Sequence, residues 1–327
     1  MVILADKNQR ELCALTTANF YVDVNDKMEF SIQIARSYWT DDLTFCNYVY
    51  IPDTEFGGMI GNVITSTTLD YVELKGITFR GRLEKKIISP PVGTSYKTVS
   101  GELNNIMKGL IESEFDGLFV VPKKDTGIVI NNYTFDRYCT LLDGLTKMLK
   151  SVGYKLRITY KRELGTTNYV LIEAVEIIDY STKIELSKDC RLNYTMDDKR
   201  DGINHLIVTG KGELKDRNVL NLYVRNDGSI GTQQYYYGAD EIAEVYENTS
   251  TETDELWNKS VDKFKELMNR KVFKMNVAKL GLSTEIGDIV GGRDYLTALC
   301  MSKPIANIIY ELVNNKEAVQ YKLEGEE

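Results

Sequence analysis

The sequence predicts an α+β protein with more than one domain. At 327 residues the chain exceeds the usual scale of roughly 100 to 200 residues per domain, which indicates two to four domains. Its first ninety or so residues alternate apolar and polar side chains, as half-buried strands do. After residue 95 the apolar period changes to three and four residues, which is typical of helices. Strand-rich and helix-containing regions therefore follow one another along the chain.

Strands dominate the first region. Residues 28–36 place Phe30, Ile32 and Ile34 on one face, and similar runs follow near residues 45–52 and 70–88. These runs are separated by the segment GGMIGN, whose glycines we expect to supply the φ freedom of tight turns. Several strands joined by such turns predict a barrel or a sandwich. The pair Pro90 and Pro91 then marks a domain boundary.

The middle of the chain predicts two amphipathic helices and a hairpin. The first helix lies within residues 100–115, with Ser100 as the expected N-cap. The second lies within residues 136–153, where Tyr138 begins an apolar stripe and Gly153 is the expected C′ residue. Strands YKLRITY and YVLIEAVEI follow and predict a hairpin against which the helices pack.

The last third returns to strands and carries one more helix. Strands are expected at INHLIVTG and VLNLYVRND, and a helix over residues 253–271, capped by Thr253 and with Trp257 in its apolar stripe. The closing segment AVQYKL reads as a final strand. RGRLEKK (80–86) and KGELKDR (211–217) share a charge pattern, which leaves open whether the two β regions are repeats.

Composition excludes several classes of protein. No stretch approaches the roughly 20 apolar residues of a membrane span, and the first residues lack the pattern of a secretory signal, so we expect folding in a cytoplasm. A net charge of −8 argues against a protein that grips phosphate backbones. The five scattered cysteines fit neither a disulfide framework nor a metal knuckle, and we expect buried thiols. The single histidine, His205, occupies a predicted strand position.

Two acidic motifs fail as sites. Residues 197–202 resemble the start of a calcium loop, but Lys199 stands where an oxygen ligand is needed and Val208 stands at the twelfth position. In residues 227–231, Asp227 replaces the first glycine of a nucleophile elbow. Both segments are predicted to be turns.

Two glycine-containing motifs also fail. Residues 209–212 contain a Gly-Lys pair without the glycine spacing of a phosphate loop, and residues 287–292 contain no GxGxxG. We expect a strand-end turn at the first and a strand that ends in a tight glycine turn at the second. The sequence therefore predicts no catalytic, cofactor-binding or metal-binding residues and no cofactor.

Several stretches resemble the tail-associated baseplate hub proteins of siphophages and prophages, a family similar to the contractile-phage baseplate hub. They are KTVSGELNNIMKGLI, NHLIVTGKGELKDR, IGDIVGGRD and the closing KPIANIIYELVNNKEAVQYKLEGEE. The resemblance implies two β-barrel-like tube domains that flank mixed α/β domains. It also implies a homotrimeric ring that continues the tail tube and adapts sixfold to threefold symmetry.

Mapped onto this chain, the resemblance implies four domains. Residues 1–94 would be the first barrel-like hub domain and 95–185 an α+β domain. Residues 186–210 with 271–327 would form the second barrel-like hub domain, and 211–270 an inserted mixed domain with one helix.

The partners implied are the distal tail protein, the tape-measure protein and other tail-tip proteins, with DNA only passing through the lumen and no stable membrane association. The chain would be a virion structural protein of the tail tip, assembled in the bacterial host cytoplasm. Because the sequence ends four residues after Leu323, we expect wall-degrading or receptor-binding activity to belong to another polypeptide.

Two other functions stay open. The 48 acidic residues and 21 tyrosines allow a tail-associated polysaccharide-binding or glycoside-cleaving protein, because paired carboxylates need no local motif. A self-assembly or adhesin module of a contractile injection machine would share the hub fold. Nothing in the sequence singles out one carboxylate pair, so a non-enzymatic structural subunit is the leading prediction.

Overall fold

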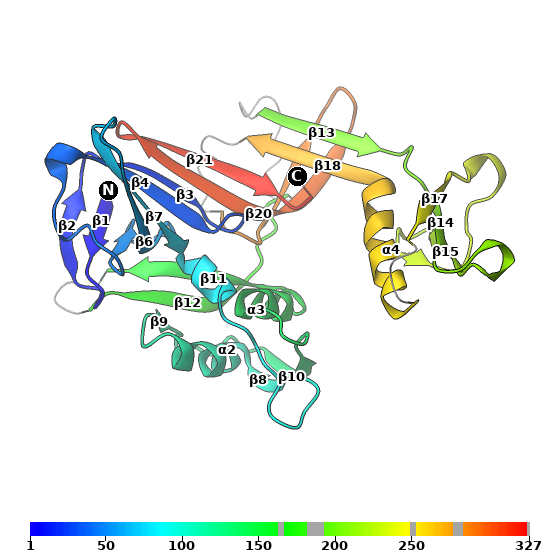
Figure 1. Cartoon of the computed structure of the whole chain (residues 1–327), viewed down its shortest axis with the longest axis horizontal. Helices are drawn as coiled ribbons and strands as arrows, with labels where there is room; N and C mark the ends of the chain where they lie inside the picture. Colours follow the sequence, from blue (N-terminus) through cyan, green and yellow to red (C-terminus); the bar gives the residue numbers. More distant parts are fainter. Residues whose placement is uncertain (163–166, 182–192, 249–252, 277–283, 326–327) are drawn as a thin grey trace. The chain divides into compact units, whose positions relative to one another are not determined.

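The computed structural model describes residues 1–162, 167–181, 193–248, 253–276 and 284–325 (Figure 1). The chain divides into two compact units, Met1–Tyr194 with Lys274–Glu327, and Thr195–Phe273. Strands predominate and four α-helices accompany them in the described residues, which confirms the predicted α+β class. None of these helices is long and apolar enough to cross a membrane.

The first unit is built on a ten-stranded sheet in the order β19-β20-β3-β4-β7-β6-β5-β1-β2, with β21 also paired to β20. Its strands are β1 (Val2–Ala5), β2 (Glu11–Leu15), β3 (Asn19–Asp23), β4 (Glu29–Ala35), β5 (Tyr48–Tyr50), β6 (Gly57–Thr65), β7 (Tyr71–Thr78), β19 (Ile289–Arg293), β20 (Cys300–Val313) and β21 (Lys316–Leu323). All of these pairings are antiparallel.

Strands from the two ends of the sequence meet in this sheet. Phe20 of β3 lies opposite Leu312 of β20, and Val22 lies opposite Tyr310. Alternate residues of β4 are buried, which confirms the predicted face of Phe30, Ile32 and Ile34. No sheet of the described residues is closed, so the barrel-like domains expected from the sequence are not shown by this structure.

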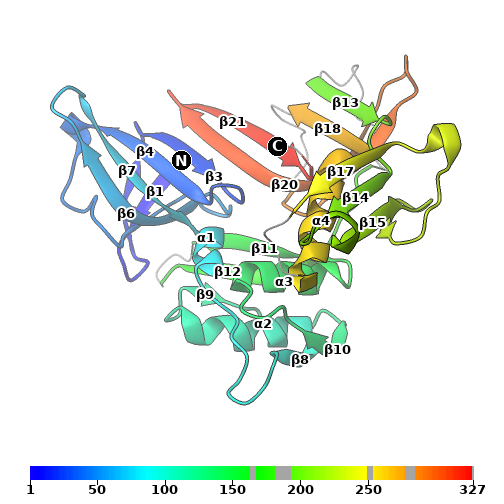
Figure 2. The ribbon, with the colours of Figure 1, turned by 45° about the vertical axis from the view of Figure 1, so that its right-hand side comes forward.

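A helical layer completes the first unit (Figure 2). It contains α1 (Phe79–Glu84), α2 (Leu103–Ile111) and α3 (Leu141–Lys150), with strands β8 (Thr98–Glu102), β9 (Phe119–Val120), β10 (Val129–Thr134), β11 (Tyr154–Lys161) and β12 (Tyr169–Glu176), and short 3₁₀ turns at Arg36–Tyr38 and Glu112–Glu114. The predicted hairpin is confirmed, because β11 and β12 pair antiparallel over their full length. One apolar core joins Tyr50 and Phe79 to Leu145 and Ile158.

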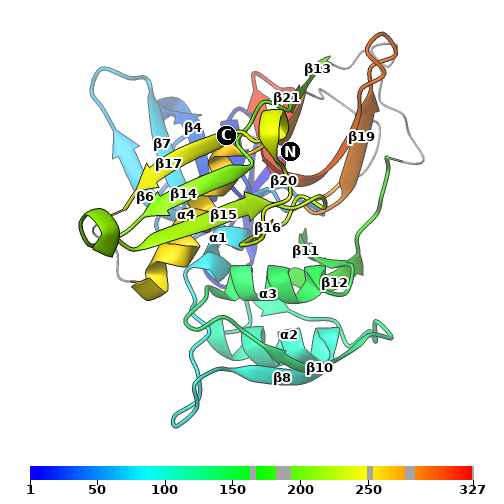
Figure 3. The ribbon, with the colours of Figure 1, turned by 90° about the vertical axis from the view of Figure 1, so that its right-hand side faces the viewer.

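The second unit contains a four-stranded sheet with one helix against it. The sheet order is β16-β15-β14-β17, formed by β14 (His205–Thr209), β15 (Val219–Val224), β16 (Ile230–Gly231) and β17 (Ala243–Glu247). Helix α4 (Thr253–Leu267) lies against this sheet (Figure 3). It buries Leu256 and Phe264 against Leu206 and Leu222. A separate pair joins β13 (Asn193–Lys199) to β18 (Arg270–Asn276), and 3₁₀ turns lie at Leu214–Asp216 and Gly238–Asp240.

The glycines of GGMIGN have a different role from the one expected. Gly57 and Gly58 lie inside β6 and have no positive φ. A β-carbon on Gly57 would lie 2.4 Å from the Val49 carbonyl oxygen, and one on Gly58 would lie 2.1 Å from that of Ile77. The prediction of tight turns here was wrong, because these glycines allow neighbouring backbones to approach closely.

Helix boundaries also differ from the predictions. Glu102, not Ser100, caps α2, because Ser100 belongs to β8 and its backbone is held in the strand. Tyr138 precedes α3, with a φ of 58° and an exposed ring, so it is not part of the apolar stripe. Gly153 does adopt a positive φ of 77°, although the helix already ends at Lys150.

Residues 79–84 form α1 and not a strand, with Thr78 as the cap whose hydroxyl accepts the Gly81 N–H. The similar segment 211–217 contains only a 3₁₀ turn at Leu214–Asp216. The shared charge pattern therefore corresponds to two different local structures, and it gives no support to a repeat.

Candidate functional site

The segments that failed as catalytic motifs have structural roles. Asp227 accepts hydrogen bonds from the backbone N–H and the hydroxyl of Ser229, which confirms a turn between β15 and β16. Thr209 is the last residue of β14 and residues 210–212 follow it, so this segment lies at a strand end as predicted. Gly291 and Gly292 lie within β19, so the expected glycine turn after that strand was wrong. Gly291 faces Ser181, and a β-carbon there would lie 2.6 Å from the Ser181 Cβ.

The cysteines differ from the prediction and the histidine agrees with it. Cys13, Cys46 and Cys300 are exposed and Cys139 is half-buried, whereas Cys190 lies outside the described residues. His205 lies in β14 as expected. Its Nδ1 is 2.6 Å from Glu241 Oε1, its Nε2 is 2.9 Å from Asn221 Oδ1, and its ring stacks on Tyr223.

The most deeply buried charges of the first unit form an ion-pair network. Lys155 of β11 is 5% exposed, and its Nζ lies 2.6 Å from Asp288 Oδ2 and 2.7 Å from Glu285 Oε2. Asp288 is fully buried and also accepts the backbone N–H groups of Ile178 and Glu285. Arg157 pairs with Glu285 at 2.7 Å. The network ties the segment that precedes β19 to the helical layer.

A second buried cation ties the same layer to the N-terminal strands. Arg80 of α1 is 3% exposed and donates to both oxygens of Glu55, at 2.6 and 3.0 Å. This bidentate geometry is the strongest that an arginine and a carboxylate can adopt.

Asn307 of β20 donates to buried Asp23 and accepts the Asn25 N–H, and so fixes the turn after β3.

A stacked tyrosine pair forms a third junction. The rings of Tyr50 and Tyr160 lie 3.6 Å apart, and the Tyr50 hydroxyl donates to Glu11, which also pairs with Arg162. Burial raises the pKa of Tyr50, and the hydrogen bond to Glu11 raises it further. Burial likewise raises the pKa of Tyr160. Both rings therefore stay uncharged well above neutral pH.

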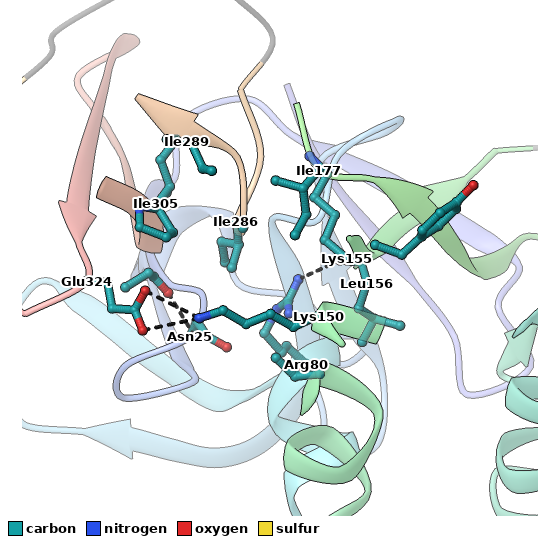
Figure 4. Close-up of a pocket in the computed structure, with 15 residues that line it drawn as sticks. Asn25, Arg80, Lys150, Lys155, Leu156, Ile177, Ile286, Ile289, Ile305 and Glu324 are labelled. Atoms are coloured by element: carbon teal, nitrogen blue, oxygen red, sulfur yellow. Dashed lines mark hydrogen bonds and ion pairs between the residues drawn. The ribbon is translucent and has the colours of Figure 1, made fainter. Parts of the chain in front are cut away.

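A cavity of about 240 Å³ lies among β20, β11 and α3 (Figure 4). Ile286, Ile289 and Ile305 form much of its wall, and the Lys150–Glu324 ion pair lies at one side. Arg80 and Lys155 also line it, but their charges are already neutralised by the partners described above. The cavity is thus an apolar space between fixed ion pairs.

These ion pairs hold separate segments of the first unit together. Each buried cation has an acidic partner at hydrogen-bond distance. Among the described residues no group of three or more His, Cys, Asp or Glu side chains could hold a metal ion. The network has no signature in the sequence, because Lys155 and Asp288 are distant in the chain and carry no local motif.

Comparisons with known proteins show the fold. No family model matches the chain, and no curated protein matches it by sequence. A tail protein from Neisseria meningitidis MC58 aligns over 98% of this chain and 96% of its own, with a TM-score of 0.51 and 12% identity. The 43 kDa tail protein of prophage MuSo2 from Shewanella oneidensis aligns over 98% and 97%, with a TM-score of 0.52 and 12% identity. The chain therefore has the fold of phage tail proteins across almost its whole length.

Proposed function

We propose that this chain is a non-enzymatic structural subunit of a phage or prophage tail tip, the baseplate hub. The observation that carries the proposal is the fold shared with two tail proteins over almost the entire chain. In this role three copies form a ring that continues the tail tube and adapts its sixfold symmetry to threefold. The four-domain division given above belongs to the same proposal.

The exposed sheet edges suit such a ring. In the described residues β2 pairs only with β1, and β21 pairs only with β20, so each strand leaves one edge of backbone groups open. Unpaired strand edges are templates for pairing with another chain. In a closed ring of this kind, one patch of each subunit contacts a different patch of the next subunit, and the rotation between neighbouring subunits brings the last one back to the first. The open edge of β2 and that of β21 are two such different patches.

The ion-pair networks suit a part that bears load. Each joins separate layers of the first unit, and breaking a buried pair costs several kcal/mol, so the layers resist separation. The partners in this role are further copies of the chain, the distal tail protein, the tape-measure protein and other tail-tip proteins. The location is the virion tail tip, after assembly in the host cytoplasm.

Native mass spectrometry tests the proposal. The purified chain is measured alone and with the distal tail protein encoded beside it, and we expect trimers in at least the second sample. A chain that stays monomeric and binds no tail protein in either sample contradicts the hub function.

A matched pair of variants tests whether the β2 edge forms the ring. Leu12 lies on β2 and Leu69 lies in a turn, and each is 40% exposed. A charge buried at an interface is unfavourable, so Leu12→Asp should weaken trimer formation and Leu69→Asp should not. Equal trimer populations in both variants would exclude the β2 edge from the interface.

A further inference from the structure

A second pocket of the first unit has features of a ligand site. Its volume is about 450 Å³, within the usual range of small-molecule pockets. The turn after β1, helix α1 and the segment that follows α2 surround it. None of its lining residues belongs to the ion-pair network or to the apolar cavity described above.

Cations without partners line this pocket. Lys7, Arg82 and Lys85 contribute to its wall, and none of them has an acidic partner within the described residues. Lys86, which lies beside them, is already committed, because its Nζ is 3.1 Å from Glu114 and 5.3 Å from the centre of the Phe115 ring. Three unpaired cations in one pocket of a chain with a net charge of −8 attract an anionic group.

Acceptors of hydroxyl hydrogens also line the pocket. They are the carboxylates of Glu114 and Asp116, and both residues are exposed.

Apolar surface completes the wall. Tyr48 is buried, and Met59 and Phe115 are half-buried beside the cations. Burial raises the pKa of the Tyr48 phenol, and the positive charge of Arg82 partly offsets this rise. The C–H face of a sugar ring can pack on such a surface.

We propose that this pocket binds an acidic sugar unit, a sugar ring that carries a carboxylate or a phosphate. Lys7, Arg82 and Lys85 bind the anionic group, and the carboxylates of Glu114 and Asp116 bind ring hydroxyls. An acidic peptide fits less well, because Glu114 and Asp116 repel its repeated negative charges while they accept sugar hydroxyls. This binding site is independent of the hub function.

Calorimetric titration of the full chain tests the proposal with four probes. Glucuronate and glucose 6-phosphate both carry an anionic group and ring hydroxyls. Comparing them shows whether the pocket prefers a carboxylate or a phosphate. Glucose lacks the anion, and inorganic phosphate lacks the ring. We expect at least one acidic sugar to bind about tenfold or more tightly than glucose and than phosphate, since each missing charged hydrogen bond is worth about a factor of ten.

Two double variants with the same change in charge give the control. The double variant Arg82→Gln with Lys85→Gln should lower the affinity for the acidic sugar about tenfold or more. Lys123→Gln with Lys316→Gln removes two exposed cations elsewhere and should leave binding unchanged. If the first variant does not fold, binding by the wild-type chain at about 1 M salt replaces it. The Debye length is then about 3 Å, so the salt screens the cations. The affinity for the acidic sugar should fall, and the affinity for glucose should not.

Three results would overturn the proposal. They are absence of binding by both acidic sugars, equal binding of glucose or inorganic phosphate, and equal loss in both double variants. A hexaglutamate peptide that binds more tightly than either acidic sugar would show that the pocket serves an acidic protein segment instead. Loss of the sugar site would leave trimer formation untouched, so the two proposals fail separately.

Discussion

Replacing Lys155 by Met should lower the free energy of unfolding of the first unit by about 3–5 kcal/mol. Lys155 is 5% exposed, and the variant leaves the fully buried Asp288 without the ammonium group that lies 2.6 Å from it. Asp288 keeps two backbone N–H donors, which do not neutralise its charge. Glu285 is affected less, because its side chain is 32% exposed and water can solvate it.

The same strand offers a matched control. Lys161 also lies on β11 and pairs with Asp53 at 2.9 Å, but the Lys161 side chain is 35% exposed and that of Asp53 69%. Exposed pairs contribute about 0–1 kcal/mol, so Lys161→Met should change stability by no more than this. A second variant, Lys155→Met with Asp288→Asn, should recover part of the loss because no buried charge remains unpaired.

Urea unfolding followed by fluorescence measures these differences. The chain has two tryptophans, Trp39 in the first unit and Trp257 in the second, so a Trp257→Phe background reports the first unit alone. Midpoint and slope give the free energy of each variant. If Lys155→Met and Lys161→Met cost the same small amount, the buried network does not stabilise the unit and the reasoning fails.

Two further predictions concern the sheet and a helix cap. Gly76→Ala should destabilise the first unit by about 1–3 kcal/mol in urea unfolding, because its β-carbon would lie 1.9 Å from the Met59 carbonyl oxygen, whereas Gly61→Ala meets open space and should stay within about 0.5 kcal/mol. Burial alone would raise the pKa of Glu102, but hydrogen bonds from Thr126 and nearby backbone N–H groups hold it below the ordinary value. The cap therefore stabilises the protein above the ordinary pKa of a glutamate, and this stabilisation is lost as the pH falls through the lowered pKa of Glu102. In thermal unfolding, Glu102→Gln should lower the free energy of unfolding by about 1 kcal/mol at pH 7 and by progressively less below about pH 4. A cost that does not change with pH would contradict this.

Periodic segments were predicted well from the sequence. The strand β4 and the helices α2 and α3 each bury one face, and that burial leaves a repeat of two or of three to four residues in the sequence. The hairpin of β11 and β12 was found for the same reason.

The errors have nonlocal causes. Gly57 and Gly58 were assigned to turns because glycine usually supplies a positive φ, whereas here a neighbouring strand excludes a side chain. Ser100 was predicted to be the cap because it precedes the apolar stripe of the helix. Its backbone instead belongs to β8, and β8 forms only by pairing with the distant strand β10, which the local sequence does not reveal. The partners Lys155 and Asp288 meet only once the unit has folded, so no spacing in the sequence reveals them.

The pairing of β3 with β20 has a consequence for biosynthesis. Asn307 binds Asp23 across 284 positions of the chain, and the whole second unit is translated between them. On the ribosome, β3 must therefore wait, with its edge unpaired, until β20 has emerged. Contacts of such long sequence separation form slowly, and open strand edges are prone to aggregation in the meantime. Within the part of the chain that the structure describes, β14 pairs only with β15 and β17 of the same unit. The second unit can therefore fold cotranslationally while the larger sheet is still incomplete.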